Sequence, residues 1–273
     1  MEPVKVADDA PSIVQLPPIM NSPIALPDPV TSKAAANRRY GGLSAEERTR
    51  QRRQKLLAAS IEVFGTLGLR KATMRDICNE ARIAERYFSE HFQSASDAYE
   101  AAFKFISEEA LKVTGSSMAA APLNTRALAE AGLRAFFTYV KEDPRRAQIL
   151  LIDASSYWRH ITIKTNPELT KQASAMRHFS MVLYPDLPKT IQLEIIGGAL
   201  MGLTLQSCLT WAQDGFKQPV DVAVNHLMFA WDGLDTWFRA EIEKAKLAPP
   251  PKTSKTVAKK APASNKAAPK LKA

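Results

Sequence analysis

Apolar residues recur at helical spacing across most of residues 43–247, and no segment of this region shows the alternating pattern that is typical of β-strands. The clearest apolar stripe ends at Gly68 and is preceded by Ser44 and Glu47, which have the spacing of a capping box. The apolar members of this stripe are Leu57, Ile61, Phe64 and Leu67. The pattern predicts an all-α fold that begins with a long helix.

Two short helical patterns meet at a tight turn within residues 73–92. The first has Thr73 as a candidate N-cap, with Asp76 placed to interact favourably with the start of the helix. The second begins at residue 84 or 85 and is anchored by Phe88 and Phe92, which lie on one face. Its opposite face carries hydrogen-bonding side chains. The pair is therefore predicted to be a helix-turn-helix whose second helix lies in a DNA major groove.

Further helical patterns follow, and two of them open with Pro144 and Pro167, because proline suits the first turn of a helix. The predicted helices span residues 97–113, 125–142, 144–158, 167–183, 188–214 and 219–244, with a loop at 114–124. The chain is thereby divided into a disordered extension (1–42), a helix-turn-helix domain (43–96), a larger helical bundle (97–247) and a disordered tail (248–273).

The net charge of +9 is concentrated at the C-terminal end of the chain. Residues 1–40 contain four basic and four acidic side chains, whereas the region from Ala248 onward contains seven lysines and no acid. This tail of lysine, proline and alanine cannot bury a core, which predicts disorder. Two interpretations stay open: a solubilising extension, or a sequence-independent contact with DNA phosphates.

The N-terminal extension is rich in proline and small residues and shows no sustained periodicity. It is either an inert extension or an arm, in which case Arg38, Arg39 and Tyr40 would enter an adjacent minor groove.

The chain has only two cysteines, Cys78 and Cys208, far apart and each inside a helical pattern. They are interpreted as reduced core residues of a cytoplasmic protein. The N-terminal residues lack the apolar segment of a secretory signal. Residues 195–212 are apolar enough to raise the question of a membrane span, but Gln206 and Ser207 favour a buried helix, so no membrane association is expected.

Four short segments carry a family resemblance: FGTLGLRKAT (64–73), MRDIC (74–78), RYFSEHF (86–92) and SASDAY (94–99). Together they make residues 48–103 resemble the DNA-binding domain of the tetracycline-repressor (TetR) family of bacterial transcriptional regulators. The chain departs from the family pattern at Arg82, where glycine is usual, at Ala84, where a serine cap is usual, at Ser89 in place of tyrosine and at Ala95 in place of lysine. A left-handed arginine costs ~1–2 kcal/mol and a missing cap about 1 kcal/mol.

The resemblance implies that the first helix and the helix-turn-helix contact DNA. Two arginines of the first helix are expected to meet phosphates, although a solvated charged face is the alternative. The candidate DNA-binding residues are Arg48, Arg52, Thr73, Arg75, Arg82, Glu85, Arg86, Tyr87, Ser89, Glu90 and His91.

The resemblance extends weakly to the bundle, through DPRRAQILLID (143–153) and WAQDGFKQPVD (211–221). In the family this region encloses a small-molecule pocket, which implies an apolar or aromatic effector here. The candidate pocket residues are Phe136, Tyr139, Tyr157, Trp158, His178 and Phe179. A stripe of this kind also fits an ordinary core, and that alternative stays open.

The last two helices build the dimer interface in the family. Gly198 and Gly202 have GxxxG spacing in the penultimate helix, which suggests a close backbone approach, either between two subunits or within one. The candidate interface residues are Gly198, Gly202, Leu205, Leu227 and Trp231.

The helix-turn-helix pattern and the family resemblance together imply a homodimeric, nucleoid-associated transcriptional regulator, a repressor that binds a palindromic operator in double-stranded DNA and is released by a small effector. The alternative is an architectural nucleoid-binding protein that is dominated by its tail and has no effector. No cluster of nucleophile, base and orienting group is visible, no Gly-rich phosphate loop is present, and the histidines lack metal-site spacing. Neither an enzyme nor a cofactor is predicted.

Overall fold

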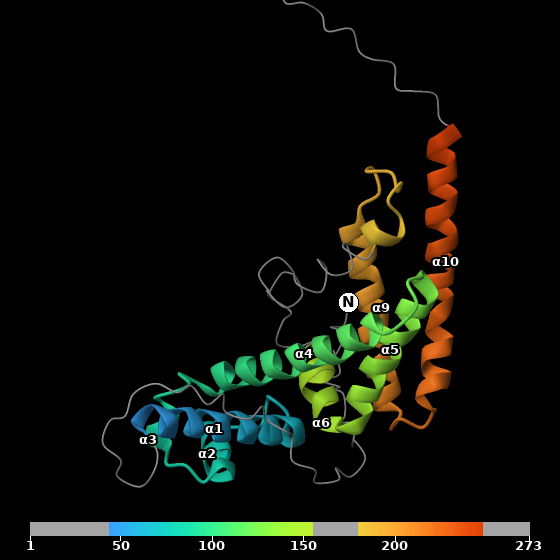
Figure 1. Cartoon of the computed structure of the whole chain (residues 1–273). Helices are drawn as coiled ribbons and strands as arrows, with labels where there is room; N and C mark the ends of the chain where they lie inside the picture. Colours follow the sequence, from blue (N-terminus) through green and yellow to red (C-terminus); the bar gives the residue numbers. More distant parts are fainter. Residues whose placement is uncertain (1–43, 155–179, 248–273) are drawn as a thin grey trace, which may run out of the picture.

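The computed structural model describes residues 44–154 and 180–247, so the N-terminal extension and the lysine-rich tail lie outside its described part. Every element of the described residues is helical, which confirms the all-α fold (Figure 1). In chain order the elements are α1 (Ala45–Leu67), α2 (Met74–Ala81), α3 (Glu85–Phe88), α4 (Ala95–Ala119), α5 (Thr125–Glu142), α6 (Pro144–Ala147), the π-helix η1 (Gln148–Asp153), α9 (Leu193–Gln213) and α10 (Val220–Leu247).

The helices form two groups that α4 connects (Figure 1). Helices α1, α2 and α3 lie at one end of the molecule, and α4 runs from them to α5 in the bundle. Helix α10 packs along α5 on the far side of the bundle, while α6 and η1 contact both α1 and α9. The short α6–η1 segment is thus the part of the bundle that reaches the N-terminal group.

One continuous apolar core supports the helix-turn-helix. Phe64, Ile77 and Phe88 are fully buried in it, one from each of the first three helices. The ring of Phe64 meets the ring of Tyr99 on α4 edge to face, with the ring centres 5.3 Å apart. Aromatic contacts of this kind add to simple burial, so this pair of rings fixes α1 against α4.

Helix α4 is longer than predicted, and the prediction of a loop is wrong for residues 114–119. The hydroxyl of Thr114 donates to the carbonyl of Ala110 at 2.8 Å and is thereby satisfied within the helix. One turn later the hydroxyl of Ser117 donates to the carbonyl of Ala131 on α5, at 3.1 Å. Packing against α5 therefore overrides the weak helix preference of these small polar residues.

The predicted helix 144–158 is not a continuous α-helix, and residues 155–158 lie outside the described part of the chain. It keeps α geometry for one turn, α6, and then becomes the π-helix η1. Two long-range hydrogen bonds hold η1: the hydroxyl of Tyr99 donates to the carbonyl of Ile149 at 2.8 Å, and Asp153 accepts from the backbone N–H of Leu69 at 2.9 Å. π-Helical segments are rare and are often found at functional sites.

Helix α9 begins at Leu193, later than the predicted start at Pro188, because residues 188–192 form turns and Gln192 provides no side-chain cap. By length and composition alone, α9 is long and apolar enough to cross a membrane. Here it packs against α5, α6, η1 and α10, and it contributes Cys208, Trp211 and Ala212 to the buried core. It is a helix of the bundle.

Candidate DNA-binding surface and effector cavity

The start of α2 is locked by a capping box, which includes the predicted N-cap Thr73. Thr73 accepts from the backbone N–H of Asp76 at 3.2 Å, and the carboxylate of Asp76 accepts from the backbone N–H of Thr73 at 2.9 Å. The hydroxyl of Thr73 also donates to that carboxylate, and this bond is the largest cause that lowers the pKa of Asp76. Asp76 is therefore ionised at neutral pH and complements the helix dipole.

The turn between α2 and α3 has the left-handed arginine that the sequence predicts. Arg82 has φ 53° and ψ 44°, and its backbone N–H donates to the carbonyls at the end of α2. The next residue, Ile83, donates its N–H to the carbonyl of Cys78 at 3.0 Å, which closes the turn. Glycine would adopt this conformation without strain. With arginine at this position the turn is strained, but it presents an exposed, charged side chain.

The recognition helix α3 is regular only over Glu85–Phe88, which is shorter than the predicted extent to Phe92. Ala84 provides no side-chain cap at its start, and the chain continues beyond Phe88 as hydrogen-bonded turns. Phe88 and Phe92 are both buried, with their ring centres 5.5 Å apart. These two rings hold the short segment in place, as predicted.

The outer face of this segment carries a stack of two arginines on one tyrosine. The guanidinium groups of Arg52, from α1, and Arg86 each lie 4.8 Å from the centre of the Tyr87 ring. Arg86 also donates to the hydroxyl of Tyr87 at 3.1 Å, and Arg52 donates to the carboxylate of Glu90 at 3.3 Å. Cation–π contacts of this kind order long side chains, so α1 and α3 present one preorganised surface.

Acidic groups on this surface are paired with arginines. Glu90 pairs with Arg52, and Glu85 pairs with Arg75 on α2 at 3.4 Å. Both pairs are solvent-exposed, so each stabilises the fold by less than about 1 kcal/mol and is easily exchanged for a DNA contact. Burial lowers the pKa of His91, and its Nε2 atom has no hydrogen-bond partner in the described part of the protein. His91 is therefore neutral at neutral pH.

None of the eleven candidate DNA-binding residues is buried. The structure gathers Arg52, Arg86, Tyr87 and Glu90 into one contact group and places Arg75 beside Glu85. Their contact with DNA stays a prediction, since no nucleic acid is present.

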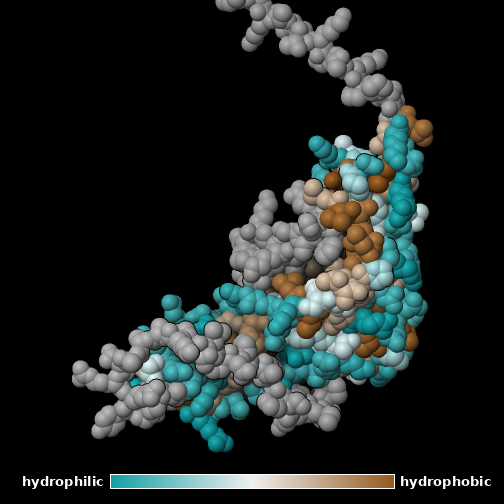
Figure 2. All heavy atoms as spheres, viewed as in Figure 1, coloured by the Kyte–Doolittle hydropathy of each residue, from teal (hydrophilic) through white to brown (hydrophobic). Residues whose placement is uncertain are grey.

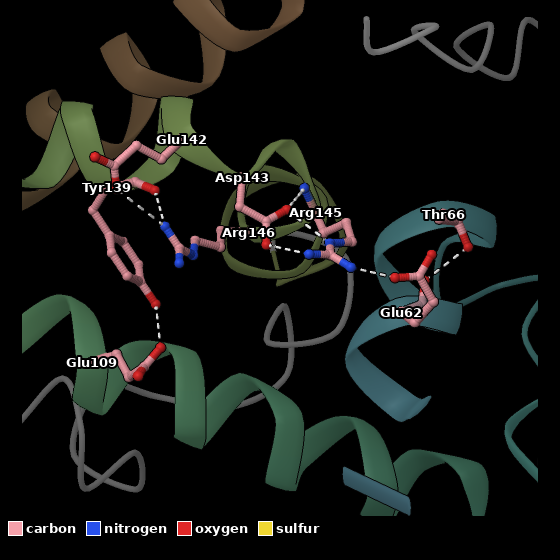
Figure 3. A network of polar contacts seen from close by, with 8 residues as sticks. All are labelled: Glu62, Thr66, Glu109, Tyr139, Glu142, Asp143, Arg145 and Arg146. Atoms are coloured by element: carbon pink, nitrogen blue, oxygen red, sulfur yellow. Dashed lines mark hydrogen bonds and ion pairs between the residues drawn. The ribbon is translucent and has the colours of Figure 1, made fainter. Parts of the chain in front are cut away.

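A buried ion-pair network joins α1 to α6 (Figure 3). The side chain of Arg145 is only 7% exposed, and its Nε and Nη2 atoms each donate to a different oxygen of the Asp143 carboxylate, both at 2.8 Å. The same guanidinium forms an ion pair with Glu62 on α1. The hydrogen bonds that Arg145 donates to Asp143, above the other causes, raise the pKa of Arg145, so the group is permanently charged. The sequence predicted only that a helix starts at Pro144, and no role was assigned to Arg145.

Two further contacts bring the end of α1 against this segment. A Cβ atom on Gly65 would lie 2.4 Å from the Cβ of Arg145, so α1 and α6 approach at a distance that only glycine permits. Gly68 ends α1 with φ 74°, and the carboxylate that caps the next N–H comes from Asp153 of η1. The amide of Gln148 donates to the other oxygen of Asp153 at 3.1 Å. The DNA-binding domain is thus attached to the bundle at three points.

Tyr139, a predicted pocket residue, belongs to the other side of this network (Figure 3). Its ring lies under the guanidinium of Arg146, at 3.8 Å, and its hydroxyl bonds to Glu109 and to the carbonyl of Ile106 on α4, each at 3.2 Å. Burial raises the pKa of Tyr139. The residue therefore ties α5 to α4 and does not line the cavity that lies further along the bundle.

That cavity has a volume of about 300 Å³ and lies between α4, α5, α9, α10 and residues 180–184. Its walls are mainly apolar and include Leu128, Leu133, Phe136, Leu200, Trp231 and Phe238. Among the predicted pocket residues, Phe136 lines it, whereas Tyr157, Trp158, His178 and Phe179 lie outside the described residues. Sequence reasoning missed the contribution of α4 and α9, because their wall residues have the same helical spacing as a core.

The five candidate interface residues fall into two groups. Leu205 and Trp231 line the cavity, and Leu227 is buried in the core. Gly198 and Gly202 are exposed, and a Cβ atom on either would meet nothing within 4 Å. The glycines therefore have no packing role within the described part of the subunit.

An exposed helix-turn-helix carried on an all-helical bundle with an internal apolar cavity is the architecture of a DNA-binding regulator. Residues 56–109 match the family described as bacterial regulatory proteins, tetR family. The match places residues 56–109 with the DNA-binding domains of this family of transcriptional regulators.

Known proteins agree with this assignment. The HTH-type transcriptional activator FasR of Mycolicibacterium smegmatis is 24% identical over 202 residues, which cover 74% of this chain and 89% of FasR. The fatty acid degradation regulator FadR from Bacillus halodurans has a TM-score of 0.57 at 14% identity, over 67% of this chain and 96% of that one. The regulator FadR from Bacillus subtilis, in complex with stearoyl-CoA, has a TM-score of 0.53 at 11% identity, over 65% of this chain and 96% of that one. At such identities the two structures share the fold with this protein.

Proposed function

We propose that this protein is a cytoplasmic, sequence-specific repressor that binds a palindromic operator as a homodimer and is released by a small apolar effector. The observation that carries this proposal is the α6–η1 segment, which touches the DNA-binding domain on one side and α9, a wall of the cavity, on the other. A ligand that displaces α9 would move the α6–η1 segment, which in turn contacts α1.

The surface of α3 supports sequence-specific binding. Arg86 is exposed and is oriented by Tyr87, and a guanidinium in that position suits the O6 and N7 atoms of guanine. Arg48 and Arg52 on α1 then meet the phosphates beside the groove, which fixes the register of the domain on DNA.

The exposed faces of the last two helices support a dimer. Figure 2 shows apolar side chains over the bundle, whereas the visible surface of the N-terminal domain is mainly hydrophilic. Ile195 on α9 is 66% exposed, and Phe229 and Trp237 on α10 are 68% and 43% exposed. Large exposed apolar side chains on the last two helices favour an interaction surface there, and a two-fold dimer of this kind reads a palindrome.

The cavity supports regulation by an effector and disfavours a purely architectural role. A volume of about 300 Å³ lies at the lower end of ligand pockets, and the walls are apolar. The structural relative from Bacillus subtilis was solved with stearoyl-CoA, a ligand with a long apolar chain, so the proposal of an effector with an apolar part is in keeping with that protein.

A second candidate function is transcriptional activation, which the name of the relative FasR favours. The same dimer and the same cavity serve both functions. The position of the operator relative to the promoter separates them, because a repressor blocks polymerase and an activator recruits it.

Selection of bound fragments from genomic DNA, followed by transcription in vitro from the selected promoter, tests the proposal. We expect one palindromic sequence to be enriched, its binding to persist at salt concentrations that abolish non-specific binding, and transcription to fall when the protein is added. Binding of all fragments with equal affinity would support the architectural role, and a rise in transcription would support the activator.

A further inference from the structure

One end of the cavity is polar, and the hydroxyl hydrogens there already form hydrogen bonds within the protein. Thr125 and Tyr184 both line the cavity, and their hydroxyl groups bond to each other. Both also bond to Oδ1 of Asp235 on α10, Tyr184 at 2.5 Å and Thr125 at 3.3 Å. Arg239 holds the same carboxylate from the solvent side, with its Nε atom 2.8 Å from Oδ2.

The remaining polar groups of the described lining are three hydroxyls and the indole N–H of Trp231. Thr114 donates its hydroxyl to the carbonyl of Ala110, and Thr204 donates to the carbonyl of Leu200 at 2.9 Å. Both hydroxyls are thereby satisfied by their own helices. Ser180 is the one other hydroxyl of the described lining, and no charged side chain is found there.

The polar end of the cavity offers hydrogen-bond acceptors to a ligand but no free hydroxyl hydrogen. A tyrosine and a threonine have one hydroxyl hydrogen each. Tyr184 donates to Asp235, because a bond to a carboxylate is stronger than a bond to a neutral hydroxyl. Thr125 then donates either to the oxygen of Tyr184 or to Asp235, and no hydrogen remains for a ligand. Lone pairs on the two hydroxyl oxygens are left over.

The protonation states agree with this assignment. The hydrogen bond from Arg239 is the first of several causes that lower the pKa of Asp235, and burial raises the pKa of Tyr184 to about 12. At neutral pH the carboxylate is ionised and the phenol keeps its proton, so the direction of the bond between them is fixed.

We infer that this cavity takes an elongated apolar molecule whose single polar end donates a hydrogen bond, such as a medium-chain alcohol. A carbonyl or ether oxygen finds no donor at Thr125 and Tyr184 without breaking a bond to Asp235. A carboxylate is in addition repelled by Asp235. This inference rests on the proposed function, in which the same cavity holds the effector.

Calorimetric titration of the full-length protein with three probes tests the inference: 1-decanol, decyl methyl ether and decanoate. The alcohol and the ether have the same polar atom, and only the alcohol can donate. One additional hydrogen bond of ordinary strength predicts that 1-decanol binds about tenfold more tightly than the ether, with decanoate weakest.

Variants assign the preference to Asp235. Asp235→Ala removes the acceptor, so at least one hydroxyl hydrogen of Tyr184 and Thr125 is released for the ligand, and we expect the preference for the alcohol to fall to near one. Arg239→Gln removes the ion pair but leaves the carboxylate, and should retain the preference. Ser180→Ala should retain it as well.

Equal or tighter binding of the ether by the unmodified protein would overturn the inference, as would binding of none of the probes or a preference that only Ser180→Ala removes. Release from the operator is measured separately. A protein that binds its operator and is released by another compound keeps the proposed function while this inference fails.

Discussion

Gly65 of α1 and Arg145 of α6 lie in such close contact that a Cβ atom on the glycine would be 2.4 Å from the Cβ of the arginine. Real Cβ atoms do not approach so closely, and the obstacle is the root of a buried side chain that cannot swing away. The junction between the DNA-binding domain and the bundle is therefore close-packed, and a displacement of α6 is transmitted to α1.

Gly65→Ala should destabilise the protein although alanine favours a helix. Overpacking of a well-packed contact costs about 1–3 kcal/mol, which exceeds the ~1 kcal/mol that alanine contributes inside a helix. Urea denaturation measures the difference. Gly115→Ala on α4 is the control, because a Cβ there meets nothing within 4 Å, and this variant should be as stable as the parent or more stable. Equal stability of the two variants would contradict the close packing.

Arg145→Gln should cost about 3–5 kcal/mol, because it leaves the buried carboxylate of Asp143 without its partner. The control Arg134→Gln breaks exposed ion pairs and should cost less than about 1 kcal/mol. A double-mutant cycle with Glu62→Gln isolates the link between the domains, with an expected coupling of about 0.5–3 kcal/mol. Additive effects of the two substitutions would show that Glu62 and Arg145 do not stabilise the junction together.

Asp153 and Asp76 should respond to pH with opposite signs. Burial raises the pKa of Asp153, so its ionised form destabilises the fold at neutral pH and this cost disappears as pH falls through the raised pKa. Hydrogen bonds from Thr73 lower the pKa of Asp76, so its contribution is present above the ordinary carboxyl pKa of about 3.9 and is lost as pH falls further, through the lowered pKa.

Denaturation of Asp153→Asn and Asp76→Asn at several pH values measures both trends. Relative to the parent, Asp153→Asn should be most favourable at neutral pH and lose this advantage towards acid. Asp76→Asn should be least favourable at neutral pH and approach the parent towards acid. Parallel trends for the two variants would contradict the assignment of the shifts.

Features that depend on neighbouring residues in sequence were predictable. The caps at Ser44 and Thr73 and the left-handed conformation of Arg82 agree with the structure, because each is decided within a few residues. The longer α4 was not predictable, since Ser117 is held by a carbonyl of α5. The π-helix η1 likewise depends on a bond between Asp153 and Leu69, which are 84 residues apart.

The candidate site likewise has features that neighbouring residues decide and features that only long-range packing decides. Exposed polar residues of the helix-turn-helix could be selected from the helical period alone. The polar end of the cavity joins Thr125, Tyr184 and Asp235, from three segments that only the packed bundle brings together. No spacing between neighbouring residues in the sequence predicts a contact among these three side chains.

Arg86→Ala should relax sequence discrimination at one base pair of each half-site. One bidentate contact with guanine provides ~1–3 kcal/mol of discrimination, and alanine removes it while the phosphate contacts remain. Binding to a set of operators with single substitutions measures the effect. Arg48→Ala, a predicted phosphate contact, is the comparison and should weaken binding to every sequence alike and reduce the salt slope by about 0.9. Uniform weakening by Arg86→Ala would assign Arg86 to phosphate.

Gly202→Leu tests whether the exposed face of α9 is the two-fold interface. A side chain at this position meets nothing within 4 Å in the subunit, and leucine favours a helix over glycine by up to ~1 kcal/mol, so the subunit itself should fold normally. Between two subunits the same side chain would separate helices that glycine allows to approach, at a cost of about 1–3 kcal/mol for each overpacked contact. We therefore expect a helical protein that dissociates to a monomer on dilution and loses its palindromic operator, with Gly202→Ala intermediate. Sedimentation and circular dichroism together decide the matter, because a folded Gly202→Leu protein that remains a tight dimer would place the interface on another surface.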